Sequence, residues 1–216
     1  MEVAALNHIQ LFMEDHLMKT LLLSLSTILF LLGTTGVYAG NHEHDDDSCP
    51  LGLVNGMTLD AEFGPGSAEI TRCLKKRRHV KLVVQANRFC MDNVPNSQCT
   101  RPFALLNLAK MIDDYEITHG MKAGRDYEMV VIAHTAGGPL MLKDESINPF
   151  RNKVEALMQR GVKFYLCQNA TRAMIKKGLL PPGDATANII EGVEYVTAGI
   201  TALVDFQYQG YRYVRP

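Results

Sequence analysis

The stretch Val162–Cys167 (VKFYLC), followed at once by Gln168–Arg172 (QNATR), decides the fold of this chain. A short apolar run of this kind predicts a strand that is buried on both faces, as in a parallel sheet. Asn169 is a suitable N-cap for a helix that begins directly after the strand. The sulfur of Cys167 would then lie at the carboxyl end of a strand, beside a helix N-terminus whose partial positive charge favours the thiolate.

Cys167 has two interpretations. Open α/β sheets bind their ligands at the carboxyl ends of strands, so a thiol at this edge predicts a functional site. Buried free cysteines also serve as small apolar side chains without any chemistry, and position alone does not separate these alternatives.

Apolar runs and helical patterns alternate along the rest of the chain. Four further strands are predicted, at Val80–Ala86, Tyr127–Ala133, Val193–Thr197 and Tyr211–Val214. Helices are predicted between them, one capped by Thr100 with Pro102 in its first turn, one from Asn148 to Gly161, one ending near Gly178 and one ending at Gly210. This alternation predicts an α/β fold in which helices cover both faces of a mainly parallel, roughly five-stranded sheet.

The N-terminal region has the pattern of a secretory signal peptide. Met18–Lys19 opens an apolar run from Leu21 to Leu32, and Val37–Ala39 supplies small residues before Gly40. Cleavage is therefore expected after Ala39. The run is too short for a good membrane span, so no stable membrane anchor is expected after cleavage.

Three regions follow from this interpretation. Residues 1–39 are an upstream extension plus the cleaved signal, with translation expected to begin at Met18, because the acidic residues before it suit a signal peptide badly. Residues 40–78 are predicted as an extended arm, and residues 79–216 as the α/β domain. Since 1–39 holds one lysine and three acids, the net charge of −1 becomes +1 on cleavage. A nearly neutral protein is not expected to bind nucleic acid.

Export would place the five cysteines in an oxidising compartment, the periplasm. Cys90 and Cys99 flank a polar loop that is short enough for a local disulfide, and Cys49 with Cys73 would then tie down the arm. Four cysteines allow three pairings, so the sequence leaves the connectivity open. In this pairing Cys167 is the candidate free thiol.

Several stretches of the chain resemble the DsrE/DsrF-like sulfur-relay family. They are VVIAHTAGGPLML (130–142), VKFYLCQNATRAM (162–174) and GVEYVTAGITALVDFQYQGYRYVRP (192–216). The resemblance covers residues 80–216. It implies a DsrE-like three-layer sandwich that forms a homo-oligomer, a trimer or hexamer, and that works with a sulfur donor or acceptor protein.

Short members of that family have a strand that ends in Cys-x-Asn-[Ser/Thr/Ala]-x-Arg, which is matched here by Cys167, Asn169 and Arg172. In relatives this cysteine can carry sulfur as a persulfide, which implies catalytic roles for the three matched residues. Thr171 lies within the same motif and is a candidate ligand-binding residue. The export signal, the 40–78 arm and the loop between Cys90 and Cys99 depart from the family's pattern.

Other candidate site residues end the neighbouring strands. His134 is a candidate base for the thiol, or a group that polarises a ligand, although a lone loop histidine is more often simply solvated. Gly137 and Gly138 offer backbone N–H groups to an anion, but a pair of glycines more often forms a plain turn. Asn87 is a candidate ligand-binding residue at the end of the first strand.

The predicted mature N-terminus suits a metal. Cleavage after Ala39 would leave Gly40–Asn41–His42, a square-planar nitrogen set for Cu(II) or Ni(II), with His44 nearby. A polar leader without metal is the alternative. No cofactor is expected.

The sequence thus predicts a periplasmic sulfur-handling protein in which Cys167 accepts or transfers sulfane sulfur as a persulfide. It would be a carrier more than a stand-alone enzyme. The alternative is a non-catalytic oligomeric module that binds a small ligand or a partner, with a structural Cys167. Three C-terminal tyrosines are candidates for an oligomer interface or for core packing: Tyr208, Tyr211 and Tyr213.

Overall fold

The computed structural model describes residues 49, 52, 64–67, 71–73, 77–183 and 185–216. These residues contain one parallel sheet of five strands in the order β4-β3-β2-β1-β5. The strands are β1 (Val80–Ala86), β2 (Tyr127–Ala133), β3 (Val162–Cys167), β4 (Glu194–Val196) and β5 (Arg212–Val214). The predicted α/β fold is confirmed, with the predicted bounds for the three central strands and shorter edge strands.

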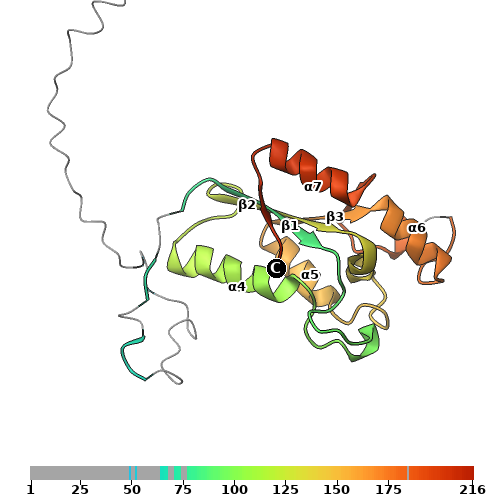
Figure 1. Cartoon of the computed structure of the whole chain (residues 1–216), viewed down its shortest axis with the longest axis horizontal. Helices are drawn as coiled ribbons and strands as arrows, with labels where there is room; N and C mark the ends of the chain where they lie inside the picture. Colours follow the sequence, from blue (N-terminus) through green and yellow to red (C-terminus); the bar gives the residue numbers. More distant parts are fainter. Residues whose placement is uncertain (1–48, 50–51, 53–63, 68–70, 74–76, 184) are drawn as a thin grey trace, which may run out of the picture. The chain divides into compact units, whose positions relative to one another are not determined.

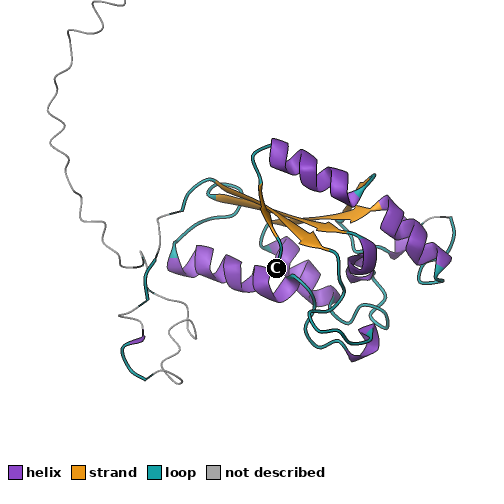
Figure 2. Cartoon of the chain, in the orientation of Figure 1, coloured by secondary structure: helices purple, strands orange, loops and turns teal. Residues whose placement is uncertain are grey.

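Helices cover both faces of this sheet, which gives three layers (Figure 1). The α-helices are α4 (Leu105–Asp113), α5 (Arg151–Gln159), α6 (Gln168–Lys176) and α7 (Gly199–Tyr208). The described residues also form shorter helices, namely η1 (Asn96–Gln98), η2 (Asp114–Thr118), η3 (Thr135–Met141) and η4 (Thr186–Asn188). Figure 2 shows α4 and α5 on one face and α7 on the other. Within the described residues, no helix is long and apolar enough to cross a membrane.

The two faces bury different sets of side chains, because successive residues of a strand point to opposite faces. Under α4 and α5 lies a large apolar core, to which β1 contributes Leu82 and Val84 and β3 contributes Phe164 and Leu166. The core under α7 is small and consists of five buried residues, namely Val83, Val130, Ile132, Ala202 and Leu203.

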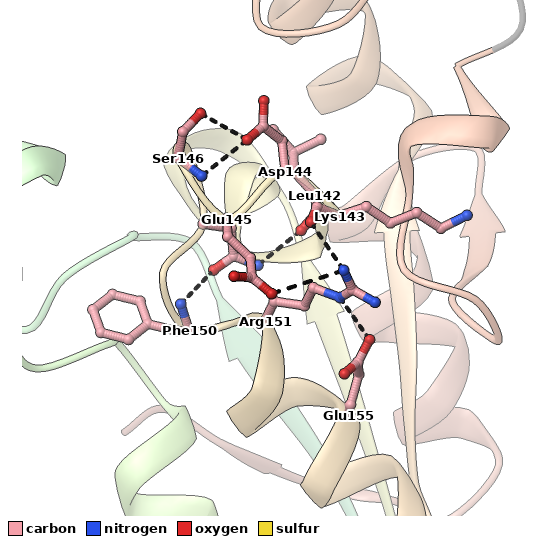
Figure 3. Close-up of polar contacts among 9 residues, drawn as sticks. Leu142, Lys143, Asp144, Glu145, Ser146, Phe150, Arg151 and Glu155 are labelled. Carbon is pink, nitrogen blue, oxygen red and sulfur yellow. Dashed lines mark hydrogen bonds and ion pairs between the residues drawn. The ribbon is translucent and has the colours of Figure 1, made fainter.

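The loop that joins η3 to α5 is held by side chains that bond to its backbone (Figure 3). The buried Asn148 amide donates to the carbonyl oxygens of Leu140 and Leu142 at 2.7 and 3.0 Å. Arg151 donates from Nη1 to the carbonyl oxygen of Lys143 at 3.5 Å. These bonds fix η3, which leads directly out of β2, against the rest of the domain.

Three predicted helix starts are wrong. The helix expected from Thr100 begins at Leu105, because the preceding segment bonds to the loop that follows β1, with the Phe103 N–H donating to the carbonyl oxygen of Phe89 at 3.0 Å. The helix expected from Asn148 begins at Arg151, since the Asn148 side chain instead accepts from the N–H of Phe150.

The third correction concerns Asn169. Helix α6 begins at Gln168 immediately after β3, so Cys167 occupies the N-cap position and Asn169 lies inside the helix. The strand therefore passes into the helix without a connecting residue.

Two disulfides are present among the described residues. Cys90 is joined to Cys99 and Cys49 to Cys73, with Cα atoms 5.7 and 5.2 Å apart. These are the pairs that the sequence analysis placed together. The signal peptide, its cleavage site, the predicted boundaries within 1–48 and the candidate metal ligands His42 and His44 lie outside the described residues.

Candidate functional site

Cys167 ends β3 and is the free cysteine of the described residues. Its side chain is 4% exposed. The Sγ atom accepts a hydrogen bond from the backbone N–H of Gly199 at 3.2 Å. Gly199 is the first residue of α7, so the sulfur receives one of the N–H groups that have no partner within that helix. The positive end of a helix therefore faces the sulfur, although that helix is α7 and not the one that directly follows β3.

His134 directly follows the neighbouring strand, β2, and lies beside Cys167. Ala133 of β2 is paired with Leu166 of β3. His134 and Cys167 are the residues that come next after this pair. Neighbouring strands are about 4.8 Å apart. Gly199 also packs on His134, because a Cβ atom at that glycine would lie 2.7 Å from the Cβ of His134. Gly199 therefore contacts both residues.

A buried glutamine connects His134 to the edge of the sheet. Nε2 of Gln85, on β1, lies 2.8 Å from Nε2 of His134. The hydroxyl of Tyr213, on β5, donates to Oε1 of Gln85 at 2.5 Å. Gln85 and His134 are 8% and 5% exposed, so the contact between them is screened from water, whereas Tyr213 is 42% exposed.

Three residues of this site were not predicted from the sequence, namely Gln85, Tyr213 and Gly199. Tyr213 was considered only for an oligomer interface or for core packing. One signal was available for the first, because a glutamine in the apolar strand VKLVVQA must find a partner if it is buried. No local signal reveals the second, since the pairing of β5 with β1 depends on the order of the strands.

His134 is held in its neutral form. Burial lowers the pKa of its imidazole below the ordinary value of 6.5. The ring is therefore uncharged near neutral pH, and its role must be that of a neutral donor or acceptor.

The other residues of the cysteine motif do not bond to the sulfur. Nη1 of Arg172 donates to Oδ1 of Asn169 at 3.2 Å, and both side chains are exposed on α6. The buried Thr171 hydroxyl lies 3.3 Å from the carbonyl oxygen of Cys167, to which it donates. Catalytic roles for Asn169 and Arg172, and ligand binding by Thr171, remain predictions.

The glycine pair after His134 serves close packing. A Cβ atom at Gly137 would lie 2.0 Å from the carbonyl oxygen of Ala86, and one at Gly138 would lie 3.2 Å from the Cβ of Ala170. The N–H of Gly137 is used by the carbonyl of His134 at 2.9 Å. These contacts account for both glycines, and anion binding by them remains a prediction.

Asn87 follows β1 at the same sheet edge. Its Oδ1 atom is buried and has no hydrogen-bond partner within the described residues. An acceptor of this kind suits a ligand that donates a hydrogen bond. In the part of the chain that the structure describes, no group of three or more His, Cys, Asp or Glu residues is placed to hold a metal ion.

This chain has matches among solved structures and protein families. A protein of unknown function from Methanobacterium thermoautotrophicum, MTH1491, has a solved structure that is similar at 20% sequence identity and a TM-score of 0.44, over 63% of this chain and 99% of that one. No curated protein matches the sequence. The model of the DsrE/DsrF-like family matches residues 89–216, which include the free cysteine, His134 and Gly199. This chain is therefore a member of the DsrE/DsrF-like family.

Proposed function

We propose that this protein is an exported sulfur-relay protein in which Cys167 accepts sulfane sulfur and carries it as a persulfide. Membership of the DsrE/DsrF-like family supports a role related to sulfur relay. The observation that carries the proposal is the contact between Cys167 Sγ and the first N–H of α7 at 3.2 Å. A helix N-terminus carries a partial positive charge, which suits the negative charge of a persulfide.

The transfer is a thiol exchange. The thiol of Cys167 releases its proton to solvent, and the thiolate attacks the outer sulfur of a donor R–S–S⁻. A bond forms between Sγ and that sulfur while the S–S bond of the donor breaks. The leaving thiolate R–S⁻ keeps the electron pair, so no external oxidant or reductant is needed.

Mass spectrometry of the mature protein tests this chemistry. Protein purified without reductant is incubated with a sulfane-sulfur donor and then mapped by peptide. A gain of one sulfur atom on the Cys167 peptide is expected, with none on the bridged Cys90 and Cys99 peptides. The Cys167→Ser variant should gain nothing, and an unmodified Cys167 in the wild type would reject the carrier role.

A ligand-binding module with a structural Cys167 is the second candidate. The 4% exposure of this residue favours it, because inert structural cysteines are typically buried. The unpartnered Oδ1 of Asn87 favours it as well. Alkylation separates the two functions, since a carrier thiol should react with iodoacetamide near neutral pH within minutes, and a structural thiol should react only on unfolding.

Export to the periplasm is part of the proposal. Two disulfides among the described residues support an oxidising compartment. Sequencing the N-terminus of protein recovered from the periplasm should give Gly40 as the first residue. Recovery of uncleaved protein from the cytoplasm would reject both the signal peptide and the compartment.

Homo-oligomer formation is proposed as well. Three apolar residues of α7, Ile200, Val204 and Tyr208, are 60%, 44% and 89% exposed. They follow one another at four-residue spacing and therefore share one side of the helix. Tyr211 has another role, since its hydroxyl donates to Glu128 at 2.7 Å and its ring packs on Phe206.

A further inference from the structure

We propose that Gln85 and Tyr213 are positioning residues that keep His134 neutral with its proton on Nδ1, so that His134 serves the Cys167 site as a hydrogen-bond donor and not as the base that takes the thiol proton. This inference rests on the proposed function, because Cys167 is the site that it serves. It goes beyond that function by assigning a protonation state to its neighbour.

The direction of the hydrogen bonds carries the argument. A tyrosine hydroxyl bonded to an amide oxygen can only donate to it, so Tyr213 occupies Oε1 of Gln85. Gln85 is then left with its NH₂ group toward His134, 2.8 Å from the ring nitrogen Nε2. An NH₂ group is a donor without acceptor capacity, so Nε2 must be unprotonated and the ring proton must sit on Nδ1.

This arrangement removes the basic lone pair of His134. The lone pair on Nε2 is occupied by Gln85, and Nδ1 already carries a proton. Taking a second proton would break the bond to Gln85 and would place a charge in a site that is 5% exposed. No carboxylate is among the groups that these contacts place around the ring, which are the Gln85 amide, the Tyr213 hydroxyl behind it, Gly199 and Cys167.

The position of His134 makes its protonation state matter to the sulfur. His134 and Cys167 occupy adjacent positions at the ends of β2 and β3, and Gly199 packs on both. The Gly199 N–H already supplies a donor to Sγ. A neutral His134 offers a second N–H, on Nδ1, at the same sheet edge and brings no charge to it.

The test is the tautomer of His134, measured by ¹⁵N NMR on histidine-labelled protein, with its signals assigned from the His134→Asn variant. The wild type should show a protonated Nδ1 and an unprotonated Nε2. The Gln85→Glu variant should put a proton on Nε2 and raise the pH midpoint of His134 by about 1–3 units, because a carboxylate there favours the charged ring.

Tyr213→Phe frees the amide of Gln85 to turn over and should give a mixture of tautomers. Sulfur loading of Cys167 should slow about fivefold, the factor that one ordinary hydrogen bond is worth. Tyr211→Phe is the matched control, since its hydroxyl bonds to Glu128 and not to Gln85. It should leave both the tautomer and the loading rate unchanged.

Several outcomes would overturn the inference. A wild-type His134 with its proton on Nε2 would mean that Gln85 accepts from the ring. An unchanged tautomer in Tyr213→Phe would remove Tyr213 from the positioning chain. Failure of the proposed function looks different: Cys167 would take up no sulfur, while the tautomer and its response to Tyr213→Phe would still support the positioning role.

Discussion

The face of the sheet under α4 and α5 and the face under α7 use their buried positions differently. Under α4 and α5 the inward residues of the central strands are apolar from end to end, as in Leu82, Val84 and Ala86 of β1. Lys81, Val83 and Gln85 of the same strand lie on the side under α7, where Val83 is buried and apolar, Gln85 is buried and polar, and Lys81 is half-exposed.

This difference separates stability from chemistry. A face covered by two helices can bury many apolar side chains and needs no polar partners. On the face covered by α7, Gln85, His134 and Cys167 lie at the carboxyl ends of the strands. Gln85 bonds to His134, and Cys167 bonds to the start of α7. Changes on the first face should therefore cost stability, and changes on the second should alter reactivity.

The largest effect on stability is expected when two adjacent residues of β3, which point to opposite faces, are each replaced by alanine. Phe164 is 1% exposed in the large core, and Phe164→Ala should lower the free energy of unfolding by about 3–5 kcal/mol. Tyr165 is half-buried against Phe206, with ring centroids 5.3 Å apart, and Tyr165→Ala should cost about 1–2 kcal/mol. Urea unfolding measures both. Equal losses would contradict the division between the faces.

Gly199→Ala should have the next largest effect. The new Cβ would lie 2.7 Å from His134, so either the ring or the start of α7 must move. We expect a loss of about 1–3 kcal/mol in unfolding free energy and slower sulfur loading of Cys167. Ile200→Ala, at the exposed next position of the helix, is the control. Matching stabilities for the two variants would mean that Gly199 is not in close contact with the site.

The central part of this fold could be predicted because its signals are local. The apolar runs at 80–86, 127–133 and 162–167 mark the strands correctly. Parallel strands share a carboxyl edge, so the proximity of His134 and Cys167 also follows from the sequence. The helix starts were missed because side-chain and loop contacts, such as those of Asn148, override local capping signals.

The polar chain could not be predicted for a different reason. Val83 is paired with Tyr213 because β5 joins the outer edge of β1, although 129 residues of chain lie between them. Nothing in either segment specifies this pairing, which follows from the packing of the whole sheet. The sequence analysis expected the helix directly after β3 to face the sulfur. That prediction was wrong for the same reason, since α7 lies far from Cys167 in the sequence and reaches it only through the tertiary fold.

A smaller effect is expected from pH. Because burial lowers the pKa of His134, the unfolded chain binds a proton below about pH 6.5 that the folded protein binds only at lower pH. Stability should therefore fall as the pH drops below that value. Burial also lowers the pKa of His119, so part of the slope should persist in His134→Asn. Urea unfolding at pH 7.5 and 5.5 measures how much stability each protein loses between these two pH values. An equal loss in the wild type and in His134→Asn would mean that His134 takes up its proton as readily in the folded state as in the unfolded chain.

The smallest effect on the fold is expected at the outer side of α7. Replacing Ile200, Val204 and Tyr208 together by Gln changes exposed side chains, and each change should alter the free energy of unfolding by about 0.5 kcal/mol or less. The same variant should dissociate the oligomer if these residues form its interface, which sedimentation measures directly. Ile117→Gln, at a residue 53% exposed on η2, is the control and should leave assembly intact. An oligomer that survives the triple variant would place the interface elsewhere than on the outer side of α7.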